Sequence, residues 1–400
     1  MDGTPQHTES EIHIREFFSA NPALDKELGE VEVMTGRYTN EEWAAQVAET
    51  QRKVLAEVRD RQKEGGKGWK YETPSAASTG LSKTIDHTVL KLDAKEAQID
   101  ALCAEARVEN FKSVCVRLPW VQKCVNNLKG TDVVVACVVG FHEGTQDTYE
   151  KLKEARAAVA AGAAELDLVL NYSILTKHNP PPTSPSLSSR DSATDTITAA
   201  NTAVNSRPRA GTAATEGPYS VGTASTVGEE DEREIPDYSA IYKELASIRA
   251  LCPSPTVIKL ILETSQLTDL QILAAAHLAA SANLDFIKTS TGFHGPGATL
   301  PHVQLMVTAA EYLSTKTRSN GGSPVRGGGR KMEVKASGGI RSWEDARKML
   351  EAGATRLGTS SGVWIMQEGR KAVEAEAAGK RPGMTTRLYT DNSFADGEEY

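Results

Sequence analysis

From residue 81 onward, short apolar segments alternate with longer segments whose apolar residues recur at helical spacing. The apolar segments are nearly continuous in Val, Ile and Leu, which is typical of strands covered on both faces in a parallel sheet. The candidate strands are 84–90, 113–117, 133–139, 166–170, 257–262, 284–288, 332–336 and 356–358. Such strand–helix units predict a closed (β/α)8 TIM barrel, in which functional residues lie at the carboxyl ends of the strands. An open doubly wound sheet is the alternative, and it is disfavoured because no strand–turn–helix segment carries a G-x-G-x-x-G fingerprint.

Two segments interrupt this alternation. The longer one is rich in Pro, Ser, Thr and Ala and holds too few large apolar residues to offset the entropy of ordering it. Its position after the fourth strand puts it near the functional end of the barrel, so a lid is the alternative to a disordered insertion. The predicted division is 1–80 for an N-terminal extension with a helix at about 41–61, 81–370 for an α/β barrel domain, 177–237 and 314–330 for the two low-complexity insertions, and 371–400 for a mobile C-terminal tail.

Charge, hydropathy and cysteine usage exclude several classes of protein. A formal net charge of -8 and a pI near 5.6 argue against a nucleic-acid-binding surface, which would carry a basic stripe. No apolar run approaches the roughly 18 residues of a membrane-spanning helix, and the polar first residues are unlike a targeting peptide. The 5 cysteines have no C-x-x-C spacing and fall mostly in apolar runs, which predicts reduced thiols in a cytoplasmic protein. The 8 histidines show no metal-ligand spacing, so neither a metal nor a cofactor is expected.

Lys288 ends the sixth candidate strand, directly after the apolar residues Phe286 and Ile287. Lysine is rarely buried without a partner, and a desolvated or cation-flanked amine loses its proton more easily and can attack a carbonyl. The alternative is a side chain that turns into solvent at the strand end. Lys335 lies near the end of the seventh candidate strand in a similar setting. Two lysines on adjacent strands would lower the pKa of both by repulsion, which predicts a neutral, nucleophilic Lys288 near physiological pH.

Asp167 alternates with apolar residues in the fourth candidate strand, and alternate strand positions face the interior of a barrel. An unpaired carboxylate is costly there, so we expect it to pair with the lysines, either as a proton shuttle or as a purely structural salt bridge. Cys115 on the second strand has no histidine partner that the sequence can place, which favours pocket lining or core over a nucleophile. His294 follows the sixth strand, where packing or water binding is expected.

Glycine and serine follow the seventh and eighth strands. The strings Ser337-Gly338-Gly339 and Gly358-Thr359-Ser360-Ser361-Gly362 occupy the positions where barrels bind phosphate through backbone N–H groups and a helix N-terminus. Tight turns would explain either string alone, whereas both strings together predict a phosphate site.

Six strings in this order, IDHTVLK, GFHEGT, ELDLVLNYS, FIKTSTGFHGPGAT, EVKASGGIR and LGTSSG, resemble the deoxyribose-phosphate aldolases, which are class I aldolases with a TIM-barrel fold. The resemblance runs from about residue 82 to 366, apart from the two insertions. It implies reversible cleavage of 2-deoxy-D-ribose 5-phosphate into D-glyceraldehyde 3-phosphate and acetaldehyde through a lysine Schiff base. It also implies that Lys288 forms the Schiff base, that Asp167 relays protons and that Lys335 lowers the pKa of Lys288. The family's substrate and phosphate contacts match Asp86, Cys115, Gly292, Gly338, Gly339, Gly358, Ser360 and Ser361.

Three features depart from the family pattern. Phe293 stands where some members have a lysine, which puts one phosphate contact in doubt. The insertion after Asn171 is longer than the usual loop, and the N-terminal extension has no counterpart in compact bacterial forms. Two other functions stay open: a phosphate-binding barrel isomerase, which would not need two facing lysines, and a catalytically silent scaffold. The expected partner is a small phosphorylated sugar, with no nucleic acid and no membrane, and the sequence leaves a homo-oligomer open.

Overall fold

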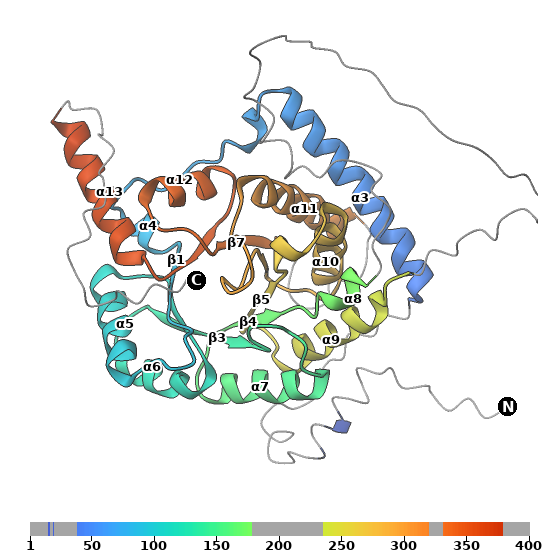
Figure 1. Ribbon diagram of the computed structural model, residues 1–400, viewed down its shortest axis with the longest axis horizontal. Helices are drawn as coiled ribbons and strands as arrows, with labels where there is room; N and C mark the ends of the chain where they lie inside the picture. Colours follow the sequence, from blue (N-terminus) through green and yellow to red (C-terminus); the bar gives the residue numbers. More distant parts are fainter. Residues whose placement is uncertain (1–14, 17–18, 20–37, 178–234, 320–330, 379–400) are drawn as a thin grey trace, which may run out of the picture.

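The computed structural model describes residues 15–16, 19, 38–177, 235–319 and 331–378. Eight parallel strands close into a barrel in the order of the sequence, and helices surround it (Figure 1). The strands are β1 (Ile85–Thr88), β2 (Ser113–Val116), β3 (Val134–Val139), β4 (Glu165–Val169), β5 (Val257–Ile261), β6 (Phe286–Lys288), β7 (Glu333–Ser337) and β8 (Arg356–Thr359). The prediction of a (β/α)8 TIM barrel is confirmed.

Helices connect the strands because parallel neighbours can only be joined by a crossover. The α-helices of the described residues include α3 (Asn40–Lys63), α4 (Thr79–Ser82), α5 (Glu96–Glu109), α6 (Val121–Asn127), α7 (Thr148–Ala160), α8 (Ser173–Thr176), α9 (Tyr238–Leu251), α10 (Asp269–Ser281), α11 (Leu300–Ser319), α12 (Trp343–Glu351) and α13 (Gly362–Ala377). Short 3-10 helices lie at Lys67–Trp69, Leu118–Trp120 and Thr264–Gln266.

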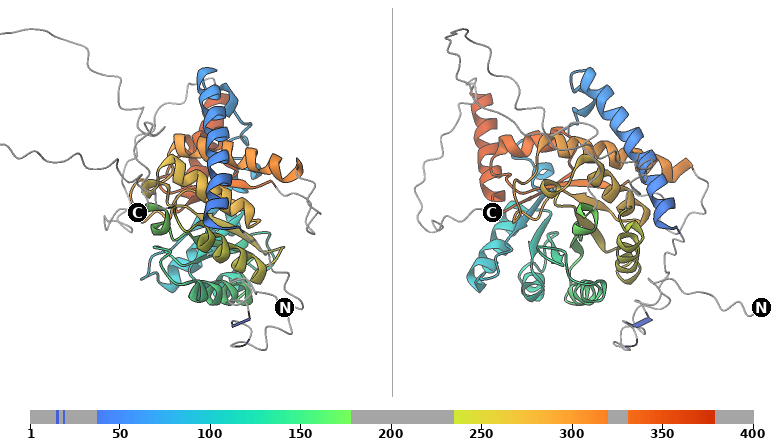
Figure 2. Two further views of the ribbon diagram at one scale, coloured as in Figure 1. Left: turned by 90° about the vertical axis from the view of Figure 1, so that its right-hand side faces the viewer. Right: turned by 45° about the vertical axis from the view of Figure 1, so that its right-hand side comes forward.

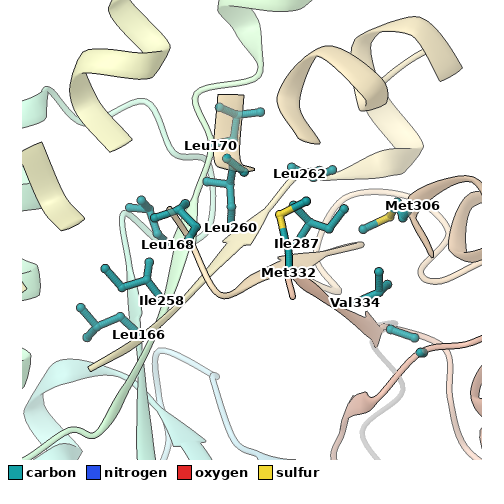
Figure 3. Close-up of a cluster of buried hydrophobic side chains, with 14 of the residues drawn as sticks. Leu166, Leu168, Leu170, Ile258, Leu260, Leu262, Ile287, Met306, Met332 and Val334 are labelled. Atoms are coloured by element: carbon teal, nitrogen blue, oxygen red, sulfur yellow. The ribbon is translucent and has the colours of Figure 1, made fainter. Parts of the chain in front are cut away.

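Alternation along the strands separates an apolar outer layer from the barrel interior. Side chains such as Leu166, Leu168, Ile258 and Leu260 are buried in the large hydrophobic core (Figure 3). The residues between them in sequence take the opposite face of the sheet. In β5 the residue between Ile258 and Leu260 is Lys259, which is completely buried. Most residues of such a strand are therefore apolar, although an interior-facing position can hold a charged residue such as Lys259.

Helix α3 lies across the outside of the barrel, against α9, α10 and α11 (Figure 1 and Figure 2). Thr39 and Glu42 form a capping box at its start, which satisfies two backbone N–H groups that a helix end leaves free. Trp43 is buried, and its ring lies 4.8 Å from the ring of Tyr242 on α9. The helix of the N-terminal extension therefore packs on the outer helices of the barrel.

Two boundaries differ from the prediction. Helix α11 continues to Ser319, past the predicted start of an insertion at 314, and the Ser314 hydroxyl donates to the Ala310 carbonyl within it. Helix α13 continues to Ala377, past the predicted start of the tail at 371. The remaining parts of both insertions and of the tail lie outside the described residues: 178–234, 320–330 and 379–400.

All five cysteines are buried, and each is a free thiol. Within the ranges that the structure describes, no helix has both the length and the apolar character needed to cross a membrane.

Candidate active site

Seven charged side chains meet inside the barrel, and all of them are buried. Four are cations and three are carboxylates: Lys259, Lys288, Lys335 and Arg356, with Asp86, Glu165 and Asp167. Interior-facing positions on six different strands supply them. Buried charges are costly unless they are paired and hydrogen-bonded, and here every member of the cluster lies within ion-pair distance of at least one opposite charge.

Asp167 on β4 is the centre of this cluster. Its Oδ2 accepts hydrogen bonds from Lys288 Nζ and from Lys335 Nζ, each at 2.8 Å, and its Oδ1 accepts one from Lys259 Nζ at 2.7 Å. Burial raises the pKa of this carboxyl, but the three lysines together hold the pKa well below its usual range. Asp167 is therefore ionised in the resting site. The structure brings it together with both predicted lysines.

The two predicted lysines differ in their number of carboxylate partners. Lys288 contacts Asp167 alone, whereas Lys335 contacts Asp167 at 2.8 Å and Asp86 at 2.6 Å. Burial lowers the pKa of Lys288, and the charge of Lys335 lowers it further against the opposing pull of Asp167. Burial also acts to lower the pKa of Lys335, but its two carboxylates outweigh burial and raise it. The prediction that both pKa values fall is correct for Lys288 and wrong for Lys335.

The balance of charge in the interior favours a neutral Lys288. With every member ionised, four cations would face three carboxylates and leave one positive charge in excess. Charges interact strongly in a site that excludes water, so the loss of one proton is favourable. Among the four cations, Lys288 is the one with a single carboxylate partner in the described ion pairs. The cluster therefore directs deprotonation to Lys288.

Sequence reasoning missed three members of the cluster, which are Lys259, Arg356 and Glu165. Lys259 Nζ lies 2.7 Å from both Glu165 and Asp167. Arg356 on β8 lies 2.7 Å from Asp86 and 3.0 Å from Glu165. A charged residue within an apolar strand was the signal that singled out Lys288, and the same signal is present in β5 and at the start of β8. Their ion pairs connect β4, β5, β8 and β1 inside the barrel.

The glycines predicted to bind phosphate have two different surroundings. Gly292, Gly338 and Gly339 have φ angles of 88°, 84° and 76° in the loops after β6 and β7, a backbone conformation that favours glycine. A Cβ at Gly292 or Gly339 would meet no atom within 4 Å, so both face open space. A Cβ at Gly358 would instead lie 2.9 Å from Lys335 Cε and 2.9 Å from Ser337 Cβ. Gly358 therefore makes room for Lys335, and its phosphate role stays a prediction.

Ser360 and Ser361 lie between the end of β8 and the start of α13. Ser360 is exposed, and the Ser361 N–H donates to the Thr359 hydroxyl at 2.9 Å. The predicted serines therefore stand at a helix N-terminus, on the same carboxyl-terminal side of the barrel as the glycine loops.

Cys115 belongs to a small apolar cluster of its own. The members are Leu90, Cys115, Ala136, Val138, Phe141, Val169 and Ile261. Cys115 Sγ lies 3.9 Å from Asp167 Oδ2. Burial, and next the Asp167 charge, raise the pKa of the thiol to about 11, so the sulfur is not a thiolate near neutral pH. Cys115 therefore lines the barrel beside Asp167.

Aromatic rings from the loops after β3 and β6 pack together. His294 Nε2 and His142 Nδ1 are 2.9 Å apart and share a hydrogen bond. The Phe293 ring stacks on the His142 ring at 4.9 Å with 10° between the planes. The position that follows the Thr291-Gly292 turn thus holds an aromatic stack, and His294 packs as expected. No group of three metal-ligating side chains occurs in the described part of the chain.

Comparison with known proteins finds relatives over most of the chain. No family model matches the chain. The deoxyribose-phosphate aldolase of Coccidioides immitis is 37% identical over 300 residues, which cover 75% of this chain and 84% of that protein. The deoxyribose-phosphate aldolase of Carboxydothermus hydrogenoformans is 38% identical over 292 residues, covering 73% and 96%. A crystal structure assigned to the Coccidioides immitis aldolase matches with a TM-score of 0.59 at 32% identity and covers 84% of this chain and 99% of its own.

Proposed function

This chain belongs to the deoxyribose-phosphate aldolase family, and we propose that its barrel cleaves 2-deoxy-D-ribose 5-phosphate reversibly with Lys288 as the Schiff-base amine. The products are D-glyceraldehyde 3-phosphate and acetaldehyde. The enzyme is a class I aldolase, a carbon–carbon lyase. The observation that carries the residue assignment is the contact of Lys288 with Asp167 at 2.8 Å, in a buried cluster that disfavours its protonation.

Schiff-base formation uses the proton of Lys335. The neutral Lys288 amine adds to the open-chain C1 aldehyde and forms a carbinolamine. Loss of water from the carbinolamine needs one proton, and Lys335, which holds its proton tightly in the resting site, supplies it through the shared Asp167 carboxylate. The product is an iminium ion at Lys288 beside a neutral Lys335. The number of positive charges in the cluster therefore stays the same, which is favourable in a site that excludes water.

Cleavage returns that proton. The C3 hydroxyl loses its proton to Asp167, directly or through a water, and Lys335 takes it up to become an ammonium again. The C2–C3 bond breaks, and its electron pair moves toward the iminium, which becomes a neutral enamine. The C3 carbon leaves as the aldehyde of D-glyceraldehyde 3-phosphate. Lys335 protonates the enamine at C2 through Asp167. Hydrolysis of the resulting iminium releases acetaldehyde and the Lys288 amine, and its proton returns to Lys335.

The phosphate is proposed to lie over the loops after β6, β7 and β8. Gly292 and Gly339 face open space, and Ser360 and Ser361 precede the N-terminus of the 16-residue helix α13. Backbone N–H groups and the positive end of a helix dipole favour an anion there. Phe293 has an uncharged side chain, which stacks on His142, so it offers the phosphate no cation.

Borohydride trapping with acetaldehyde tests the assignment of Lys288. The wild-type enzyme should form a stable reduced adduct, and peptide mass mapping should place it on Lys288. Lys288→Ala should lose both the adduct and turnover, whereas Lys331→Ala, at an exposed lysine, should keep both. Turnover and an adduct on Lys335 in the Lys288→Ala protein would contradict the proposed roles.

The two other functions left open by the sequence fit this geometry less well. A phosphate-binding isomerase has no need of two lysines on one buried carboxylate, and a silent scaffold has no need of an amine held neutral. A cytoplasmic location and assembly into a homo-oligomer stay predictions.

A further inference from the structure

Glu263 is a buried carboxylate that the mechanism above does not use. In β5, Lys259 joins the interior charge cluster and Ile261 joins the interior apolar cluster. Glu263 follows two residues later, beyond the end of β5, and is 0% exposed. Ile261 pairs in register with Lys288 on β6. Glu263 therefore lies at the carboxyl-terminal end of the barrel, beside the residues that follow the Schiff-base lysine.

One carboxylate oxygen of Glu263 accepts hydrogen bonds, and the other has no partner within the described residues. Oε2 accepts a hydrogen bond from the Thr291 N–H at 3.1 Å and a second, very short one from the Thr291 hydroxyl. Oε1 is buried and has no hydrogen-bond partner among the residues that the structure describes. A buried polar atom that stays unpaired is destabilising. This arrangement holds the carboxylate in place through Oε2 and leaves Oε1 for a ligand.

One position in the neighbouring loop after β6 is open. Gly292, directly after Thr291, faces open space. Ser290, two residues beyond Lys288, has a buried hydroxyl oxygen that also lacks a partner within the described ranges. Two polar atoms without a partner in the described ranges therefore follow the adjacent strands β5 and β6, and one of them lies two residues beyond the Schiff-base lysine. Polar groups placed in this way typically orient a bound substrate.

The pKa shift of Glu263 differs from that of Asp167, the central carboxylate of the charged cluster. Burial raises the pKa of the Glu263 carboxyl, although the Thr291 bonds and the nearby His294 and Lys288 oppose the shift. The pKa of Asp167 moves in the opposite direction. Two carboxyls of one site that are displaced in opposite directions typically have different roles. Asp167 is committed to the lysines, and Glu263 is free to contact substrate.

The substrate has one hydroxyl that suits this position, given the proposed function. The two carbons that remain on Lys288 as acetaldehyde carry no hydroxyl, and the C3 hydroxyl must face Asp167 because it reacts. The C4 hydroxyl remains. We propose that Glu263 Oε1 accepts a hydrogen bond from the C4 hydroxyl, which makes Glu263 a specificity-determining residue for acceptor aldehydes that carry a 2-hydroxyl group.

The test measures the aldol direction, with acetaldehyde as donor and two matched acceptors. D-glyceraldehyde carries the 2-hydroxyl that becomes the C4 hydroxyl, and 3-hydroxypropanal lacks it. The wild-type enzyme should prefer D-glyceraldehyde in kcat/KM. In Glu263→Gln the amide oxygen still accepts from Thr291, but a neutral amide group replaces Oε1. Because a hydrogen bond to a charged group is stronger than a neutral one, the preference should fall about tenfold.

Two controls separate this role from a structural one. Acetaldehyde has no hydroxyl, so borohydride trapping on Lys288 should be unchanged in Glu263→Gln. Glu154 is a half-buried carboxylate that accepts a hydrogen bond from the Gly140 N–H at 2.7 Å, and Glu154→Gln should leave the preference unchanged. An unchanged preference in Glu263→Gln, an equal loss in Glu154→Gln, or trapping that falls in parallel would overturn the proposal. Absence of trapping in the wild-type enzyme would instead refute the proposed function.

Discussion

At the scale of single residues, two lysines on neighbouring strands have opposite pKa shifts. Lys288 and Lys335 pair in register on β6 and β7, and both are buried to nearly the same extent. Lys288 has one carboxylate partner and its pKa falls, while Lys335 has two and its pKa rises. Burial lowers the pKa of both amines, so the second carboxylate, Asp86, decides the difference. The site thus holds one amine with a lowered pKa, the proposed nucleophile, and one with a raised pKa, the proposed proton donor.

Lys335→Met should move the acid limb of the pH–rate profile to higher pH. Removal of this cation lets Lys288 hold its proton more tightly, and it leaves Asp167 and Asp86 with fewer positive partners, which raises the Lys288 pKa further. The neutral fraction of Lys288 at pH 7 then falls. Turnover should drop steeply near neutral pH and recover in part at higher pH. Recovery should be incomplete because the proton that Lys335 supplies for Schiff-base formation is absent at every pH.

The measurement is kcat/KM against pH for the wild-type enzyme, Lys335→Met and the control Lys331→Met, whose lysine is exposed. The displacement of the acid limb should be limited because burial, the largest cause of the lowered Lys288 pKa, is unchanged. A profile that keeps its shape and only scales downward would mean that the two lysines are not coupled.

At the scale of elements, buried ion pairs tie strands together across the barrel. Lys259 joins β5 to both carboxylates of β4, and Arg356 joins β8 to β1 and β4. Removal of one partner of a buried pair leaves an uncompensated charge, which is more destabilising than removal of a whole pair. The stability of the strands therefore depends on the balance of charge in the interior.

Lys259→Met should lower the free energy of unfolding by about 3–5 kcal/mol, the usual cost of breaking a buried ion pair. The double variant Lys259→Met with Glu165→Gln removes one negative charge as well, and it should be more stable than the single variant. Urea unfolding measures both. Lys123→Met, at a lysine paired with exposed carboxylates, is the control and should cost about 1 kcal/mol or less. A strictly additive double variant would argue against charge balance.

At the scale of the whole molecule, the additions to the barrel differ in their relation to the site. Helix α3 covers the outer helices α9 to α11 (Figure 1), away from the interior where the charged cluster lies. The insertion 177–237 interrupts the chain between α8 and α9, and residues 178–234 of it lie outside the described residues. Both flanking helices belong to the barrel, so the insertion is bounded by ordered structure.

Replacement of residues 180–230 by a few Gly and Ser residues should keep kcat and KM within a few-fold. The segment has few large apolar residues, and a lid needs such residues to exclude water from a site. Shortening a loop changes the closure entropy by only about 0.6 kcal/mol per twofold change in length. Steady-state kinetics with thermal unfolding tests this. A variant with an unchanged melting temperature and a turnover reduced about a hundredfold would identify the segment as a lid.

Local patterns in the sequence were sufficient for the fold and for singling out three of the charged residues that the structure brings together. The alternation of apolar strands and amphipathic helices predicted the closed barrel, because the periodicity of burial is written into neighbouring residues. Lys288, Lys335 and Asp167 were found because each is a charge within or at the end of an apolar strand. The structure brings them together although Asp167 and Lys288 are 121 residues apart in the chain.

The number of partners of each charge depended on the tertiary structure alone. Register between strands places Asp86 against Lys335 and not against Lys288, and nothing local to either lysine encodes that difference. Glu263 escaped notice because it follows the strand in a left-handed conformation, with φ 57°, where strand periodicity no longer predicts direction. The tertiary structure shows that Thr291, in the loop after β6, donates to Glu263 Oε2, while Oε1 has no partner among the described residues. The sequence by itself determined the barrel and the types of charged residue inside it. Pairing across the barrel decided which amine has the lowered pKa and which carboxylate oxygen lacks a partner among the described residues, because pKa values and hydrogen bonds depend on distances between residues far apart in the chain.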